Sequence, residues 1–288
     1  MSSLTITLIQ TDLHWEDKKA NLTVLSKKIE SIQEKTEVII LPEMFSTGFS
    51  MKPELLAENM NGETVQWMKK ISSEKNIILT GSIIIEEPSI PIAIGTQDEK
   101  KYFNRLIWML PNGEYGFYDK RHLFAYGNEH IYYNPGNKRL IASVKGWKIN
   151  LQVCYDLRFP VWSRQSPLLS SSKDEEGPGV KSEPEYDLLI YVANWPERRS
   201  LAWKTLLQAR AIENQCYVVG VNRVGNDGNG IYHGGGSMIV DPLGKVLYQK
   251  ENEEDIFTYS FQKEKLDEVR SKFPFWKDAD SFYINGFQ

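Results

Sequence analysis

Short apolar runs alternate with longer amphipathic stretches along this chain. In the first half the pattern predicts strands at residues 4–9, 38–41, 77–85 and 102–110 and helices at residues 18–34 and 63–75. In the second half it predicts strands at residues 148–153, 188–192, 217–221, 236–240 and 246–248 and a helix at residues 201–213. Strands that alternate with helices are typical of α/β proteins, with sheets covered by helices on one face.

The chain of 288 residues shows no internal repeat and no linker, so we expect one domain over residues 1–288. Residues 166–185 interrupt the compact pattern, because they are rich in Ser, Glu, Pro, Lys and Gly. This composition predicts a flexible insertion, either a lid or binding loop or simply a tolerated insertion. A C-terminal tail is expected from about residue 262.

Composition narrows the classes of function. A net charge of -4 and a pI near 5.7 argue against nucleic-acid binding. We also expect no membrane association and a cytoplasmic protein, because no apolar run is long enough to span a bilayer and no signal-type segment opens the sequence. Two cysteines and four histidines, without C-x-x-C or H-E-x-x-H spacing, predict no metal site.

Cys154 ends a strand-like run and precedes a polar segment. A side chain at the carboxyl end of a strand lies where α/β proteins usually bind ligands, and backbone N–H groups after it can receive an oxyanion. The alternative is a small buried hydrophobe, which is the better interpretation for Cys216. A nucleophilic cysteine of ordinary pKa needs a base and a cation.

Glu43 and Lys120 are the candidate base and cation. Glu43 follows the apolar run 38–42 and precedes further apolar residues. These neighbours argue against a solvated surface position and suit a general base. Lys120 lies beside another basic residue and, taken alone, is better interpreted as a solvated surface residue. Glu129 is also unremarkable by itself.

Three segments become specific when they are taken together: Leu41-Pro42-Glu43-Met44-Phe45, Tyr118-Asp119-Lys120-Arg121-His122-Leu123-Phe124 and Val153-Cys154-Tyr155-Asp156-Leu157-Arg158-Phe159-Pro160. Their content and order resemble the Glu-Lys-Cys triad of the nitrilase (carbon–nitrogen hydrolase) superfamily. Further segments resemble its bacterial omega-amidase branch: Ala193-Asn194-Trp195-Pro196, residues 209–215, residues 221–225, Lys272-Phe273-Pro274 and residues 278–280.

The resemblance implies an α/β fold of the four-layer α-β-β-α sandwich type and a homodimer or higher homo-oligomer. It implies a catalytic triad of Glu43, Lys120 and Cys154, with Glu129 positioning substrate or lysine. Glu43 would take the thiol proton, and Lys120 with the N–H of Tyr155 would stabilise the oxyanion. Ammonia would depart, and the thioester that remains would be hydrolysed by water. No cofactor is implied.

The implied substrate is a small carboxamide such as 2-oxoglutaramate or 2-oxosuccinamate. Arg158 would bind its carboxylate, although an ion pair with Asp156 or another acid is the alternative. Tyr155, Trp195 and Phe124 are the other candidate substrate-binding residues. The Arg198-Arg199 pair is a weaker anion-binding candidate. A nitrilase, an N-carbamoyl amino-acid hydrolase or a non-catalytic scaffold on the same fold remain the alternatives.

Overall fold

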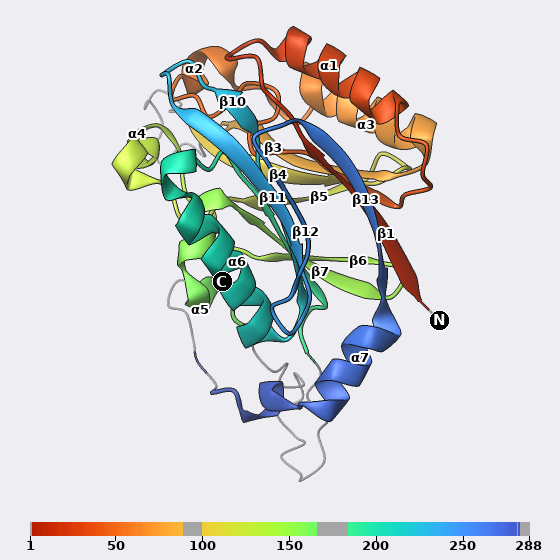
Figure 1. Cartoon of the computed structure of the whole chain (residues 1–288). Coiled ribbons are helices and arrows are strands. Elements are labelled where there is room, and N and C mark those ends of the chain that lie inside the picture. The colour runs from red at the N-terminus through yellow and green to blue at the C-terminus, as the bar shows by residue number, and fades with distance from the viewer. Residues whose placement is uncertain (1, 89–99, 166–183, 281, 283–288) are drawn as a thin grey trace.

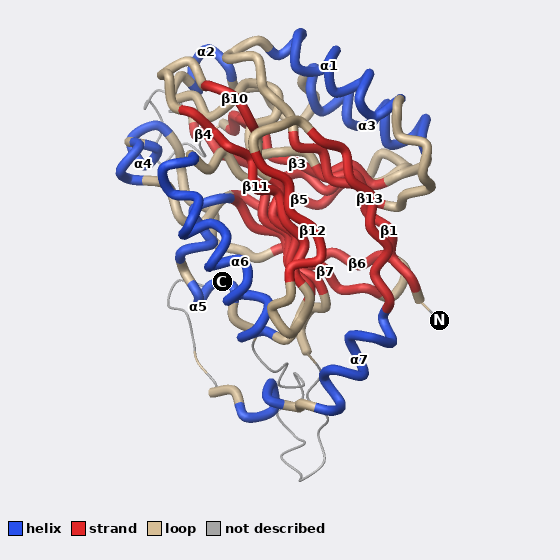
Figure 2. The backbone as a smooth tube through the Cα atoms, viewed as in Figure 1, coloured by secondary structure: helices blue, strands red, loops and turns tan. Residues whose placement is uncertain are grey.

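The structure is a computed structural model that describes residues 2–88, 100–165, 184–280 and 282. The expectation for residues 166–185 therefore lies outside the described residues, apart from positions 184 and 185. Figure 1 shows two stacked sheets with helices on their outer faces, and Figure 2 shows the same layers by secondary structure. The four-layer α-β-β-α sandwich is confirmed.

The first sheet combines the N-terminal strands with a strand from near the C-terminus. Its order is β13-β1-β2-β3-β4-β5, with β1, β2 and β3 parallel and the other neighbours antiparallel. The strands are β1 (Ser3–Gln10), β2 (Val38–Ile40), β3 (Ile78–Glu87), β4 (Lys101–Met109), β5 (Tyr115–Asp119) and β13 (Asp255–Gln262).

The second sheet comes from the other half of the chain. Its order is β10-β11-β9-β8-β7-β6, with β12 paired to β11 and with β7, β8 and β9 parallel. The strands are β6 (Leu140–Val144), β7 (Trp147–Val153), β8 (Leu188–Val192), β9 (Tyr217–Val221), β10 (Val224–Asn226), β11 (Tyr232–Val240) and β12 (Val246–Glu251).

The longer helices cover the outer faces of these sheets. Apolar side chains of α1 (Lys18–Glu30) and α3 (Glu63–Lys75) pack on the first sheet, and those of α6 (Ser200–Asn214) pack on the second. The other helical segments are α2 (Pro53–Leu56), η1 (Ala125–Gly127), α4 (Glu129–Tyr132), η2 (Cys154–Arg158), α5 (Pro160–Ser163), η3 (Glu197–Arg199), α7 (Lys263–Lys272) and η4 (Phe275–Asp278). No helix in the described part of the chain is long and apolar enough to cross a bilayer.

Strand alternation divides the apolar side chains between a central core and two outer cores. In β2, Val38 and Ile40 enter the core between the sheets, whereas Ile39 faces the α1 and α3 side. In β8, Leu188 and Ile190 likewise face the central core. Successive strand residues point to opposite faces, so strands buried on both faces read as continuous apolar runs.

Most predicted elements are confirmed, and the differences have local causes. The predicted helix at 18–34 ends at Glu30, where Ser31 caps the last carbonyls. The predicted helix at 63–75 is confirmed, and it stops at Asn76, whose φ of +52° is the left-handed conformation of a C-terminal cap. Beyond residue 262, where a tail was expected, the chain forms α7 and η4.

Candidate active site

Glu43 lies in the loop that follows β2 and is fully buried. Its Oε1 accepts hydrogen bonds from Lys120 Nζ at 2.9 Å and Asn104 Nδ2 at 2.8 Å. Its Oε2 accepts from the backbone N–H of Asn194, also at 2.8 Å, just past the end of β8. The carboxylate is therefore held from both sheets in one orientation.

Lys120 directly follows β5, and its ammonium is buried between two carboxylates. Besides Glu43, it donates to both oxygens of Glu129, at 3.0 and 2.9 Å. It also lies 5.1 Å from the ring centre of Phe49. Burial alone would lower the pKa of Lys120, but the charges of Glu129 and Glu43 outweigh burial and raise it. The side chain is thus a fixed cation at neutral pH.

Cys154 lies at the carboxyl end of β7 and begins η2. Its φ of +45° is a left-handed conformation that a non-glycine residue adopts only at a cost, and such strain concentrates at functional sites. Burial and the neighbouring Glu43 raise the pKa of its thiol. The N–H of Tyr155 belongs to the first turn of η2, so it has no acceptor within that helix. A nucleophile and a donor for an oxyanion stand side by side.

Asp156 connects the lysine loop to the cysteine loop and is fully buried. Its Oδ2 accepts from the Tyr118 hydroxyl at 2.7 Å and from the N–H of Val153 at 3.0 Å. Its Oδ1 accepts from the N–H of His122 at 2.9 Å and lies 2.8 Å from that residue's Nδ1. One carboxylate therefore fixes residues on both sides of Lys120 and the residue just before Cys154.

We expect Asp156→Asn to disrupt this junction. The amide nitrogen of asparagine would face a donor, leaving buried hydrogen-bonding groups unpaired. We expect a loss of about 2–4 kcal/mol in the free energy of unfolding, together with a lower kcat. Urea denaturation and steady-state kinetics measure the two effects. A variant within 0.5 kcal/mol of the wild type, roughly the scatter of neutral surface substitutions, would contradict this account of the loop contacts.

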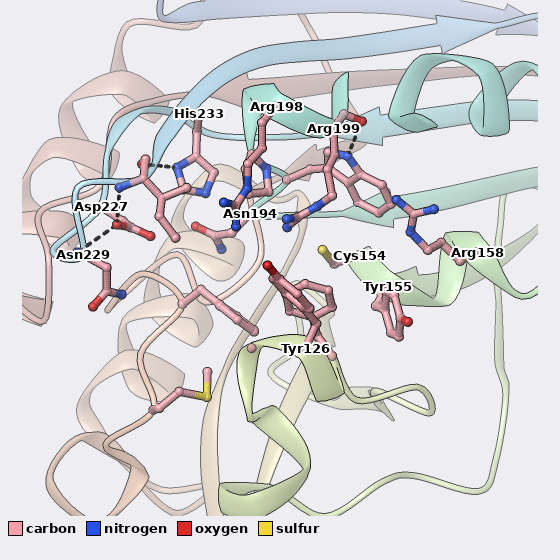
Figure 3. A pocket seen from close by; sticks show the side chains of 17 residues that line it. Tyr126, Cys154, Tyr155, Arg158, Asn194, Arg198, Arg199, Asp227, Asn229 and His233 are labelled. Carbon is pink, nitrogen blue, oxygen red and sulfur yellow. Dashed lines mark hydrogen bonds between the residues drawn. The ribbon is translucent and has the colours of Figure 1, made fainter. Parts of the chain in front are cut away.

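A pocket of about 190 Å³ opens beside Cys154 (Figure 3). All four candidate substrate-binding residues, Tyr155, Arg158, Trp195 and Phe124, line it. The guanidinium of Arg158 lies 5.0 Å from the ring centre of Trp195. Asp156, its alternative partner, is engaged in the contacts described above.

The structure adds residues that the sequence patterns missed. Asn104, in the middle of β4, donates to Glu43 and also to Glu129 Oε1 at 3.2 Å. Nothing in its local sequence indicates this role, because the contact depends on the tertiary fold. Asn194 was noted only within the Ala193–Pro196 segment, and its hydrogen bond to Glu43 places it in the cluster.

His233 lines the far side of the same pocket and should make stability depend on pH. Burial, together with the positive charge of Arg223, lowers its pKa to about 4. Between pH 6.5 and 4 the unfolded chain thus binds a proton that the folded chain does not, so stability falls as the pH falls. We expect a loss of about 3 kcal/mol over this range.

Urea denaturation at pH 7 and pH 4.5, with wild type and His233→Asn, measures this contribution. The wild type should lose more stability than the variant as the pH falls. Equal losses in the two proteins would show that His233 does not carry the effect.

Within the described part of the chain, no group of three or more His, Cys, Asp or Glu side chains could hold a metal ion. The groups assembled at this site are a buried carboxylate, a fixed ammonium and a thiol, and the thiol of Cys154 lines the small pocket.

The chain is similar to known carbon–nitrogen hydrolases. The family model described as carbon-nitrogen hydrolase matches residues 5–168 and 180–271. The Omega-amidase YafV of Escherichia coli (strain K12) is 41% identical over 286 residues, covering 99% of this chain and all of that protein. The 2-oxoglutaramate amidase of Bacillus subtilis (strain 168) is 28% identical over 277 residues, covering 95% of this chain and 96% of that protein.

A solved structure gives the same result. The crystal structure of XC1258 from Xanthomonas campestris, described as a CN-hydrolase superfamily protein with an arsenic adduct in the active site, has a TM-score of 0.86 and 40% sequence identity, covering 99% of this chain and 100% of that one. The chain belongs to the carbon–nitrogen hydrolase family and is a hydrolase that acts on amides.

Proposed function

We propose that this protein is an omega-amidase that hydrolyses the terminal carboxamide of a small 2-oxo acid to the acid and ammonia. The observation that carries the proposal is the buried cluster in which Glu43 and Glu129 hold Lys120 beside the thiol of Cys154. Two of the relatives are named Omega-amidase and 2-oxoglutaramate amidase, which supports this substrate class.

The proposed reaction begins with a protonated thiol. Glu43 takes the proton as Cys154 attacks the amide carbon, because the raised pKa of the thiol leaves little free thiolate. Lys120 and the N–H of Tyr155 stabilise the negative charge on the carbonyl oxygen. Glu43 then returns the proton to the leaving nitrogen, so ammonia departs and a thioester remains.

The second half of the reaction uses the same groups. Glu43 takes a proton from water as the water attacks the thioester, and the proton then passes to the Cys154 sulfur as the acid leaves. Glu129, which holds Lys120 through both of its oxygens, is proposed to keep the ammonium in place through both steps. No metal or organic cofactor takes part in this scheme.

The main alternative is another enzyme of the same superfamily, a nitrilase or an N-carbamoyl amino-acid hydrolase. Ammonia release from 2-oxoglutaramate, glutamine and a nitrile, with release of the free amino acid from an N-carbamoyl substrate, separates these activities. We expect 2-oxoglutaramate to react fastest. If it reacts no faster than glutamine, the omega-amidase proposal fails, and the preferred compound identifies the alternative.

We also propose that the protein forms at least a dimer. Exposed apolar side chains on α5 and α6, namely Val161, Leu201 and Ile212, support an interface on this side of the molecule. Gln165, shortly after the end of α5, hydrogen-bonds to Asn214, the last residue of α6. Sedimentation analysis measures the state in solution, and a monomer at micromolar concentration would contradict the proposal.

A further inference from the structure

The pocket beside Cys154 carries an excess of positive charge. Three guanidinium groups line it, those of Arg158, Arg198 and Arg199 (Figure 3). Within the described ranges, none of the three forms an ion pair with a carboxylate. The acidic residue on the lining, Asp227, accepts hydrogen bonds from two backbone N–H groups of its own loop through Oδ1. Unpaired cations around a small cavity favour an anionic ligand.

Arg199 is the best positioned of the three. Its backbone oxygen accepts a hydrogen bond from the indole nitrogen of Trp195 at 2.8 Å. Its guanidinium lies 4.9 Å from the ring centre of Phe124. The N–H of Phe124 in turn donates to Glu129 Oε2 at 2.6 Å. The guanidinium of Arg199 therefore contacts the ring of a residue whose backbone N–H is bonded to the cluster that holds Lys120.

The other two arginines are placed differently. In Figure 3 the Arg199 side chain projects toward the space between Asn194 and Cys154, whereas the Arg158 guanidinium lies at the edge of the pocket beyond Cys154. There it stacks on Trp195. Arg198 is exposed. A small substrate whose amide carbon meets Cys154 would therefore present its other end to Arg199.

The surroundings of Arg199 leave its charge uncompensated. Burial, followed by the charge of Arg198, lowers its pKa, and Arg158 adds to this effect. Arginine nevertheless remains charged at neutral pH, and its planar fork matches a carboxylate. Binding of an anion would offset the repulsion between Arg199 and the neighbouring guanidinium groups, whereas binding of an ammonium group would add to the repulsion.

We propose that Arg199 is the specificity-determining residue that binds the substrate's carboxylate, so that the enzyme selects short carboxamides with an acid group at the opposite end. This inference rests on the proposed function, since it names the group that chooses among amides at the same site. It also predicts discrimination against an amino acid such as glutamine, because the three guanidinium groups repel its α-ammonium.

The first test measures binding without turnover. Iodoacetamide labels Cys154 in the presence and absence of 2-oxoglutarate, and the ratio of the two rates reports occupation of the pocket. We expect the 2-oxoglutarate concentration that gives half protection to rise about 10- to 100-fold in Arg199→Met, as for loss of a charged hydrogen bond. The neighbouring Arg198→Met should shift it less than threefold, and Arg199→Lys should fall in between.

The second test separates recognition from structural damage. In Arg199→Met, kcat/KM for 2-oxoglutaramate should fall mainly through KM, and by at least tenfold more than kcat/KM for pentanamide, a neutral amide of the same chain length. Equal losses for both amides would indicate a structural role and overturn the proposal. Equal shifts in the Arg198→Met and Arg199→Met proteins would also overturn it, because a general positive field would then suffice.

The protection assay does not depend on the proposed function, so failure of the inference and failure of the proposed function can be distinguished. If wild-type protein releases no ammonia from 2-oxoglutaramate, the proposed function fails. The protection assay would still show whether Arg199 binds a carboxylate. Suppose instead that the wild type hydrolyses 2-oxoglutaramate and that Arg199→Met matches the wild type both in its protection by 2-oxoglutarate and in its kinetics. Only the inference about Arg199 is then wrong.

Discussion

Replacing Cys154 with alanine is expected to lower kcat for 2-oxoglutaramate by about 10⁴-fold or more, since the covalent route is then lost. The fold should survive, because the thiol is small and partly faces the pocket. Rates of ammonia release and a thermal melt measure the two properties. Activity within tenfold of the wild type would contradict a cysteine-based reaction.

Cys216 provides the matched control. It is fully buried in the core beneath α6, and burial raises the pKa of its thiol. Cys216→Ala should retain activity. In the wild type, iodoacetamide at neutral pH should label Cys154 well before Cys216 and abolish activity. Equal labelling of both cysteines would favour a non-catalytic scaffold instead.

Replacing Glu43 with glutamine is expected to lower kcat by about 10³-fold, within the range for loss of a general base. The substitution keeps the size of the side chain but removes the group that accepts the thiol proton and later the water proton. An amide nitrogen would also face one of the three donors that now bind the carboxylate. Steady-state kinetics of the purified variant measure the loss.

Glu129→Gln is the comparison that isolates the base. Glu129 lies in the same cluster and binds the same ammonium, but the proposed mechanism gives it no proton to carry. We expect this variant to lose at least tenfold less kcat than Glu43→Gln. The reverse order would assign the base to Glu129, and equal losses would indicate that the two carboxylates act only by holding Lys120.

The resting state differs from that of cysteine enzymes that carry a preformed thiolate. Here burial and Glu43 raise the pKa of Cys154, although Lys120 lies close enough to oppose them. The ammonium is already neutralised by two carboxylates, so it does little for the sulfur until Glu43 has accepted a proton. Proton transfer and nucleophilic attack should therefore occur together.

Much of the fold follows from local patterns. The strands at 188–192 and 217–221 were predicted with their observed bounds, because strands buried on both faces give uninterrupted apolar runs. β13 and α7 were missed. β13 does alternate, with Phe257, Tyr259 and Phe261 on the side of the central core, but it is mostly half-buried. α7 buries only Leu266 and Arg270 of its ten residues, so few apolar positions mark it as a helix.

The candidate site could be predicted only in part. Glu43 and Cys154 each follow a strand that shows in the sequence, whereas Lys120 follows β5, for which no range was predicted, and it was identified through the resemblance of its segment to the family's motif. Asn104 lies inside a strand, and its approach to Glu43 depends on how β4 lies beside the loop after β2, which no local pattern encodes. The sequence favoured Arg158 over the Arg198-Arg199 pair as the carboxylate-binding group, and the structure places all three arginines on the pocket lining.

The central claim is that Cys154 forms a thioester with the acyl part of the amide. In the most direct measurement, excess enzyme is mixed with 2-oxoglutaramate and the reaction is quenched with acid at successive times. The mass of the peptide that contains Cys154 is then determined by mass spectrometry. We expect a transient increase in the mass of this peptide that equals the mass of the acyl group, with ammonia released no later than the acid. Consumption of the substrate with Cys154 unmodified at every time would contradict it.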